Sequence, residues 1–129
     1  MKRLITIFVL PILTLLLSIK MYSQSLIPPE FPGGKRAFSD YLNKNLKWPK
    51  DGSEDVQGIV IVSFFVEKDG RLNDIKVVKS MSPAFDTEAL KVITNSPKWI
   101  PARRGGQLIK SKYSVPIKFL SVNNIKCGN

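Results

Sequence analysis

The sequence contains no histidine, and its single cysteine is Cys127. Without an imidazole, neither a Ser–His nor a Cys–His pair can activate a nucleophile. No set of thiols and carboxylates has metal-ligand spacing, and the glycine pairs at 33–34 and 105–106 lack the strand-to-helix setting of a phosphate loop. The sequence therefore predicts that the protein is not an enzyme and that it has no catalytic residue, no metal site and no cofactor.

A lone cysteine also excludes an intramolecular disulfide, so packing alone must stabilise the core. In an oxidising compartment Cys127 either cross-links two copies or belongs to a loose tail. The formal net charge of the chain is +10, and no acidic residue follows Glu88. The basic residues that do follow are Lys91, Lys98, Arg103, Arg104, Lys110, Lys112, Lys118 and Lys126. Such a cationic surface favours an anionic partner: nucleic acid, a glycolipid or an acidic protein segment.

The chain begins with a charged and then apolar segment. Lys2 and Arg3 precede an apolar run over residues 4–19, which ends at Lys20. This pattern is typical of a secretory signal peptide, and the run is shorter than the ~20 residues of a spanning helix. We expect residues 1–23 to be a cleaved signal peptide, with an inner-membrane anchor at 4–19 as the alternative. Secretion makes nucleic acid the least expected of the anionic partners, so we predict no nucleic-acid binding.

Proline and glycine mark the start of the folded part. The stretch SLIPPEFPGG at 25–34 is typical of extended chain rather than packed structure. We therefore expect an extended lead-in at 24–33, a single domain over 34–122 and a tail at 123–129.

Hydrophobic periodicity predicts two helices and three strands in this domain. Apolar residues recur at helical spacing over about 34–47 and about 83–95. A strand that begins at Gly58 is apolar on both faces, and it meets a strand over 72–80 at Asp69-Gly70, a pair that favours a tight hairpin turn. Residues 112–119 alternate apolar and polar, as a strand with one buried face does.

Pro116 decides the expected strand order. Proline has no N–H and is confined to sheet edges and bulges, so the third strand is expected at an edge. The first strand then lies in the middle, which gives the order 2-1-3. We predict an α+β fold: a small two-layer αββαβ sandwich, with a three-stranded antiparallel sheet and two helices on one face.

The expected edge strand has two functional interpretations. Lys112, Lys118 and Pro116 would discourage unspecific strand pairing, which protects against aggregation. They also leave main-chain groups available to one chosen partner, because an extended peptide can add itself to a sheet edge. Composition and periodicity alone leave both interpretations open.

Several motifs occur in an order that resembles the C-terminal domain of TonB, in the form common in Bacteroidetes-type envelopes. The motifs are PEFPGG at 29–34, WP at 48–49, GIVIVSFFVEKDG at 58–70, AFDTEAL at 84–90, PKWIPARRGG at 97–106 and VPIKF at 115–119. The resemblance implies a periplasmic domain of the energy-transducing system that serves TonB-dependent outer-membrane receptors.

In that family, the edge of the third strand captures an extended receptor segment, the TonB box, by strand addition. Carried onto this sequence, the resemblance implies a partner-binding edge with two arginines in the loop before it. The site residues expected on this basis are Arg103, Arg104, Lys110, Ser111, Lys112, Tyr113, Ser114, Val115 and Lys118.

The N-terminal part of the sequence differs from that of family transducers. Family transducers carry an uncleaved inner-membrane helix and a long proline-rich linker, whereas about 14 residues here separate Lys20 from the first helix and span at most about 46 Å. Inner-membrane motor proteins are therefore expected partners only if the chain is anchored. The alternative is a soluble module without energy transduction, which self-associates as a homodimer through its third strands or binds the envelope through its basic C-terminal third.

Overall fold

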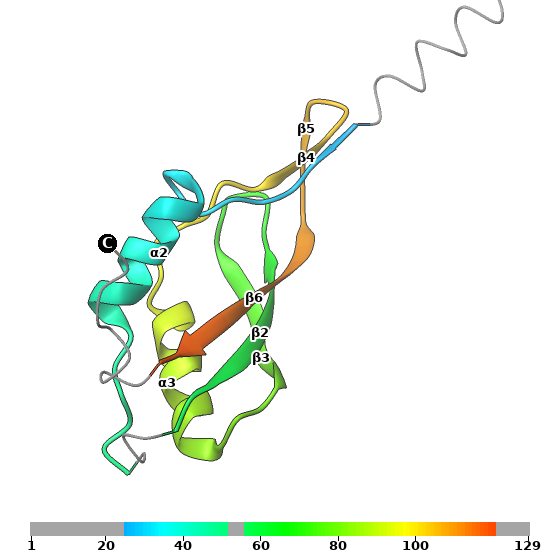
Figure 1. Ribbon diagram of the computed structural model, residues 1–129. Coiled ribbons are helices and arrows are strands. Elements are labelled where there is room, and N and C mark those ends of the chain that lie inside the picture. Colours follow the sequence, from blue (N-terminus) through cyan, green and yellow to red (C-terminus); the bar gives the residue numbers. More distant parts are fainter. Residues whose placement is uncertain (1–24, 52–55, 121–129) are drawn as a thin grey trace, which may run out of the picture.

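The computed structural model describes residues 25–51 and 56–120 (Figure 1). The predicted signal peptide or anchor at 1–23 and the predicted tail at 123–129 lie outside the described residues. The elements in chain order are β1 (Leu26–Ile27), α2 (Gly34–Asn45), β2 (Gly58–Val66), β3 (Leu72–Lys79), α3 (Pro83–Thr94), β4 (Ala102–Arg104), β5 (Gln107–Ile109) and β6 (Ser111–Phe119).

The three long strands form an antiparallel sheet in the order β3-β2-β6, with β2 in the middle. This confirms the predicted order of these strands. Asp69-Gly70 lies in the turn between β2 and β3, as predicted, and Gly70 has a φ of 88°. The Gly70 N–H donates to the carbonyl of Glu67 at 2.9 Å, which closes the turn. A Cβ at Gly70 would lie 2.2 Å from the carbonyl oxygen of Trp99, so only glycine fits there.

The prediction of one sheet is wrong, because the described residues form two. The second sheet has the order β1-β4-β5 and extends beyond the end of the main sheet (Figure 1). It takes β1 from the expected lead-in, and β4 and β5 from the stretch before the third strand, where a loop was expected. Strands of two or three residues are too short to show an alternating pattern. They form because distant segments meet: the N–H of Glu30 donates to the carbonyl of Ile100 at 2.9 Å, and the reverse bond is 2.7 Å.

The two helices differ in how deeply they pack. α3 begins at Pro83, as predicted, and buries Phe85, Ala89, Val92 and Ile93. Ser82 makes no side-chain cap; instead the carboxylate of Asp86 accepts hydrogen bonds from the Met81 N–H at 3.0 Å and from the Ser80 hydroxyl. By contrast, none of the residues of α2, all of which the structure describes, is fully buried.

One apolar core lies between the main sheet and the helices. The residues that are buried in it are Phe31, Val60, Val62, Phe64, Val66, Phe85, Ala89, Val92, Ile93, Trp99, Val115, Ile117 and Phe119. The even-numbered residues of β2 and the odd-numbered residues of β6 thus face the helices. Among the described residues, no helix has the length and apolar character needed to cross a membrane.

Candidate functional site: the outer edge of β6

The side chains of β6 alternate as the sequence predicts. Val115, Ile117 and Phe119 are buried, whereas Lys112, Ser114, Pro116 and Lys118 are exposed. The strand pairs with β2 on one side, and no described residue pairs with its other side. β6 is therefore an edge strand, and the direction of its main-chain groups decides what that edge can bind.

The hairpin fixes the direction of the main-chain groups in β2. The Glu67 N–H donates to the carbonyl of Arg71 at 2.8 Å, which lies on the β3 side. Successive residues of a strand direct their main-chain groups to opposite sides. Odd-numbered residues of β2 therefore bond towards β3 and even-numbered residues bond towards β6. The irregularities in the β2–β3 register place the extra residues in β3, so the alternation along β2 is preserved.

The pairing between β2 and β6 is regular along all of β6, and it matches even-numbered residues of β2 with odd-numbered residues of β6. The odd-numbered residues of β6 therefore exchange main-chain hydrogen bonds with β2. It follows that the N–H and C=O groups of Lys112, Ser114 and Lys118 point away from the sheet. An approaching strand would find these groups free of a partner among the described residues.

Pro116 supports this assignment independently. It lies opposite Ile61 in the middle of the paired region, where a proline directed towards β2 would remove a ladder hydrogen bond. By the assignment above, its nitrogen points to the outer edge, where no bond is lost. The proline interrupts the row of outward N–H groups between Ser114 and Lys118 but leaves its own carbonyl available.

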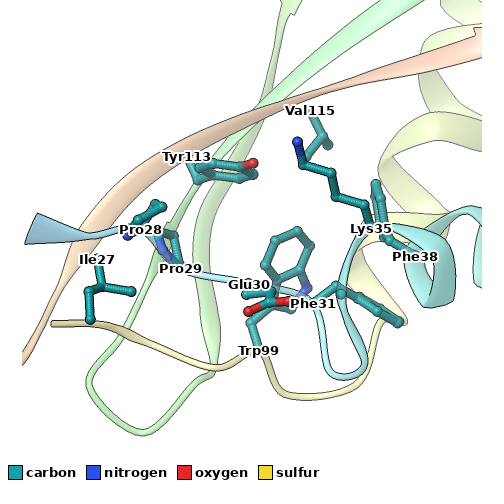
Figure 2. Close-up of a pocket in the computed structure, with 11 residues that line it drawn as sticks. Ile27, Pro28, Pro29, Glu30, Phe31, Lys35, Phe38, Trp99, Tyr113 and Val115 are labelled. Atoms are coloured by element: carbon teal, nitrogen blue, oxygen red, sulfur yellow. The ribbon is translucent and has the colours of Figure 1, made fainter.

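A groove runs along this edge, between β6 and α2. One hollow has a volume of about 560 Å³. Its walls include Phe38 and Leu42 of α2, Leu46 just after that helix, and Tyr113, Val115 and Lys118 of β6. A second pocket of about 230 Å³ continues it beside the start of β6. Figure 2 shows this pocket with Tyr113 and Val115 on the β6 side and Phe31 and Trp99 opposite them.

The groove exists because α2 is held away from β6 while its apolar side chains still face the core. Phe38, Leu42 and Leu46 pack at the margin of the core and are only half-buried. The hydroxyl of Tyr41 donates to the carbonyl of Val92 at 2.8 Å, which joins α2 to α3, and burial raises the pKa of this hydroxyl. α2 is thus fixed to its neighbouring helix and leaves the sheet edge open.

Lys110 and Ser111 were also predicted to belong to the binding edge. In the structure, the side chain of Lys110 and the main chain of Ser111 are directed towards β2 and its end. The Nζ atom of Lys110 lies 3.1 Å from Glu67 Oε1 and 4.9 Å from the centroid of the Phe65 ring. Hydrogen bonds from Lys110 and Asn73 hold the pKa of the Glu67 carboxyl below its usual value. Ser111 is an odd-numbered residue of β6, so its main-chain groups face β2. Its hydroxyl is buried without a hydrogen-bond partner among the described residues.

Arg103 and Arg104 do not lie in a loop, as expected, but in β4, the middle strand of the second sheet. Their main chain pairs with β1 and β5 on both sides. Arg103 also donates from Nη1 to the carbonyl of Gly106 at 3.0 Å. The structure therefore places Tyr113, Ser114, Val115 and Lys118 along the groove, with Lys112 beside them on the same strand, and separates the two arginines from them.

The opposite wall of the groove was not predicted from the sequence. Phe31, Lys35, Phe38 and Leu42 come from the lead-in and the first helix, which carried no expected site residue. The helical apolar stripe was visible in the sequence, but a stripe does not reveal whether its side chains are fully covered.

Together these features define a class: a small α+β domain that presents an open strand edge beside an apolar groove. Comparison with known families assigns the chain more closely. The family described as Gram-negative bacterial TonB protein C-terminal matches residues 48–120, and the chain belongs to this family. The family is associated with transport rather than with enzymatic activity, is typically periplasmic and interacts with outer-membrane receptors. No curated protein and no solved structure matches the chain.

Proposed function

We propose that this protein is a periplasmic TonB-like domain that binds extended segments of outer-membrane receptors by adding them as a strand to β6. The observation that supports this most directly is the outward direction of the main-chain groups of Lys112, Ser114 and Lys118. Strand addition uses such groups for affinity and neighbouring side-chain hollows for specificity. The family assignment supplies the class of partner, the outer-membrane receptors that TonB-like transducers serve.

The charge of the site agrees with this partner class. Lys35, Lys112 and Lys118 line or flank the groove, and among the described residues none of the three is in an ion pair. A receptor segment with acidic or neutral residues would therefore be favoured over a basic one, mainly through faster association at low salt.

A titration tests the proposal. Isotope-labelled protein is titrated with a synthetic TonB-box peptide from an outer-membrane receptor, and the backbone amide signals are followed. We expect the amides of Lys112, Ser114 and Lys118 to shift most, because a new strand would bond to them directly. Unchanged amide signals at millimolar peptide would count decisively against strand addition.

The same edge could instead pair with β6 of a second copy, which is the self-associating alternative. Sedimentation of the protein at micromolar concentration separates the two. A monomer that binds peptide supports the receptor function, whereas a stable dimer that ignores added peptide supports self-association.

Anchoring and coupling to an inner-membrane motor depend on residues outside the described part. The N-terminus of the protein recovered from cells decides between the two predictions for this segment. It is expected near Gln24 if residues 1–23 are a cleaved signal peptide and at Met1 if residues 4–19 remain as an anchor.

A further inference from the structure

We infer that the segment captured by β6 carries apolar side chains at three alternate positions, and that the one at the Tyr113 end is an aromatic ring. The ring enters the pocket between Phe31, Phe38, Trp99 and Tyr113. This inference rests on the proposed strand addition and specifies the chemistry of the segment that is added.

The spacing of α2 matches that of an added strand. Phe38 and Leu42 are four residues apart on α2, about 6 Å along the helix axis. Leu46 follows four residues later as the C-cap, and its N–H still donates to the carbonyl of Leu42 at 2.8 Å. Alternate residues of a strand lie about 6.6–6.8 Å apart and point to the same side. A strand on the outer edge of β6 would therefore bring each inward-facing side chain beside one of these three residues. Their half-buried surfaces in the 560 Å³ hollow are what such side chains would cover.

The pocket at one end of the groove suits a ring. Its walls include Phe31, Phe38 and Trp99, which already contact one another with centroid distances of 5.2–5.7 Å. The Trp99 ring also lies 5.8 Å from the ring of Tyr113. An apolar cavity of about 150 Å³ holds benzene, and this pocket has about 230 Å³. A further ring in contact with these walls gains aromatic pair energy in addition to its burial.

The position of the pocket sets the register. Tyr113 and Val115 line it on the β6 side, and Pro28 and Pro29 close its far end (Figure 2). The aromatic residue is therefore the terminal one of the three inward-facing residues. The outward-facing residues of the segment would lie beside the side chains of Lys112, Ser114 and Lys118. Charge complementarity makes these residues acidic or neutral.

Two of the four aromatic walls of the pocket, Phe31 and Phe38, lie outside the family match. Phe31, Lys35 and Phe38 precede residue 48, where the match begins. The pocket therefore combines Trp99 and Tyr113, which lie within the matched range, with residues that precede it.

The test uses the full chain and four acetylated, amidated peptides. The probes are ETFTVTVE and its reversed order EVTVTFTE, because the added strand can run in either direction. The controls are ETATVTVE, which lacks the ring, and ETFVVTTE, which has the same composition with the apolar residues adjacent. Binding is measured by calorimetry and located by backbone amide shifts.

The better of the two probes is expected to bind at least about tenfold more tightly than either control, because it alone buries the ring and both valines. The substitution Phe38→Ala should reduce the advantage of phenylalanine over alanine at least about threefold. A matched variant, Val78→Ala, removes an exposed apolar side chain from β3, the far strand of the sheet, and should leave all affinities unchanged. The comparison between peptides remains informative if Phe38→Ala lowers stability, since it leaves the protein unaltered.

Two results overturn the inference in distinguishable ways. Equal affinity for the probes and both controls, with shifts at Lys112, Ser114 and Lys118, would preserve strand addition and refute the aromatic pocket. Absence of binding by every peptide would refute both. If those three amides resist exchange before any peptide is added, and the protein sediments as a dimer, a second copy fills the groove and the inference is also wrong.

Discussion

Replacing Ser114 with proline is expected to leave the fold intact and to weaken the capture of a partner strand. The N–H of Ser114 points to the outer edge and bonds to no described residue, so its loss breaks nothing within the domain. Pro116, the next residue whose nitrogen points to the outer edge, shows that this strand accepts a proline at such a position. We expect the free energy of unfolding to change by less than about 1 kcal/mol, the range of proline effects at compatible sites.

The matched control is Val115→Pro, one residue further along. The exposed fraction of Val115 is 4%, so the residue is buried. It is an odd-numbered residue of β6, so its N–H points to β2 and bonds to Val62. Its loss leaves the Val62 carbonyl buried without a partner, which costs about 1–3 kcal/mol before any clash of the ring is added. Against a typical total of about 5–15 kcal/mol, this is a large loss.

Urea unfolding and a peptide titration measure the two effects separately. For Ser114→Pro, one lost main-chain hydrogen bond of about 1 kcal/mol should weaken peptide binding about fivefold, and the clash of the ring with the added strand should weaken it further. Equal destabilisation by the two prolines would refute the assignment of main-chain directions in β6. Unimpaired peptide binding by the Ser114 variant would refute the edge as the binding site.

Three further predictions concern the scaffold. Gly70→Ala should lower the free energy of unfolding by at least about 2 kcal/mol in urea, because φ is 88° and the new Cβ would lie 2.2 Å from the Trp99 carbonyl oxygen; an unchanged midpoint would show that the hairpin is not held against Trp99. Tyr41→Phe should cost about 1 kcal/mol in the same assay, because it removes a partly buried hydrogen bond to α3, and no loss would mean that α2 is fixed by packing alone. Lys110→Gln should raise the pKa of Glu67 towards its usual value, as followed by NMR, because Lys110 is the main cause of its lowering. The stability that the ionised carboxylate contributes should then be lost at a higher pH as the solution is acidified, and an unaltered pKa would show that the pair is not formed in solution.

The sequence predicted the long elements because each carries a complete pattern. The strand over 58–66, the Asp69-Gly70 turn and the returning strand were all recognisable, and the structure confirms them. Pro116 correctly predicted an edge position for β6. The boundaries of the helices were close, with α2 ending at Asn45 rather than near 47.

The second sheet could not be predicted in the same way. β1, β4 and β5 have two or three residues each, too few for an alternating pattern, and their partners are distant in the chain. The glycines at 105 and 106, which mark the turn between β4 and β5, looked like an isolated loop. The two arginines were for this reason assigned to a loop, whereas they lie in β4, apart from the groove.

What the amino-acid sequence determined by itself was local: the periodicity of each element, the turn residues and the position of a proline, all of which depend on neighbours within one strand or one helical turn. Only the tertiary structure decided which amides of β6 point outward, because that parity is set at the hairpin, where Glu67 bonds to Arg71, and is passed on through two strand pairings. It also decided that α2 stands beside β6 with its apolar side chains half-covered, since the depth of burial depends on how far apart two elements come to rest.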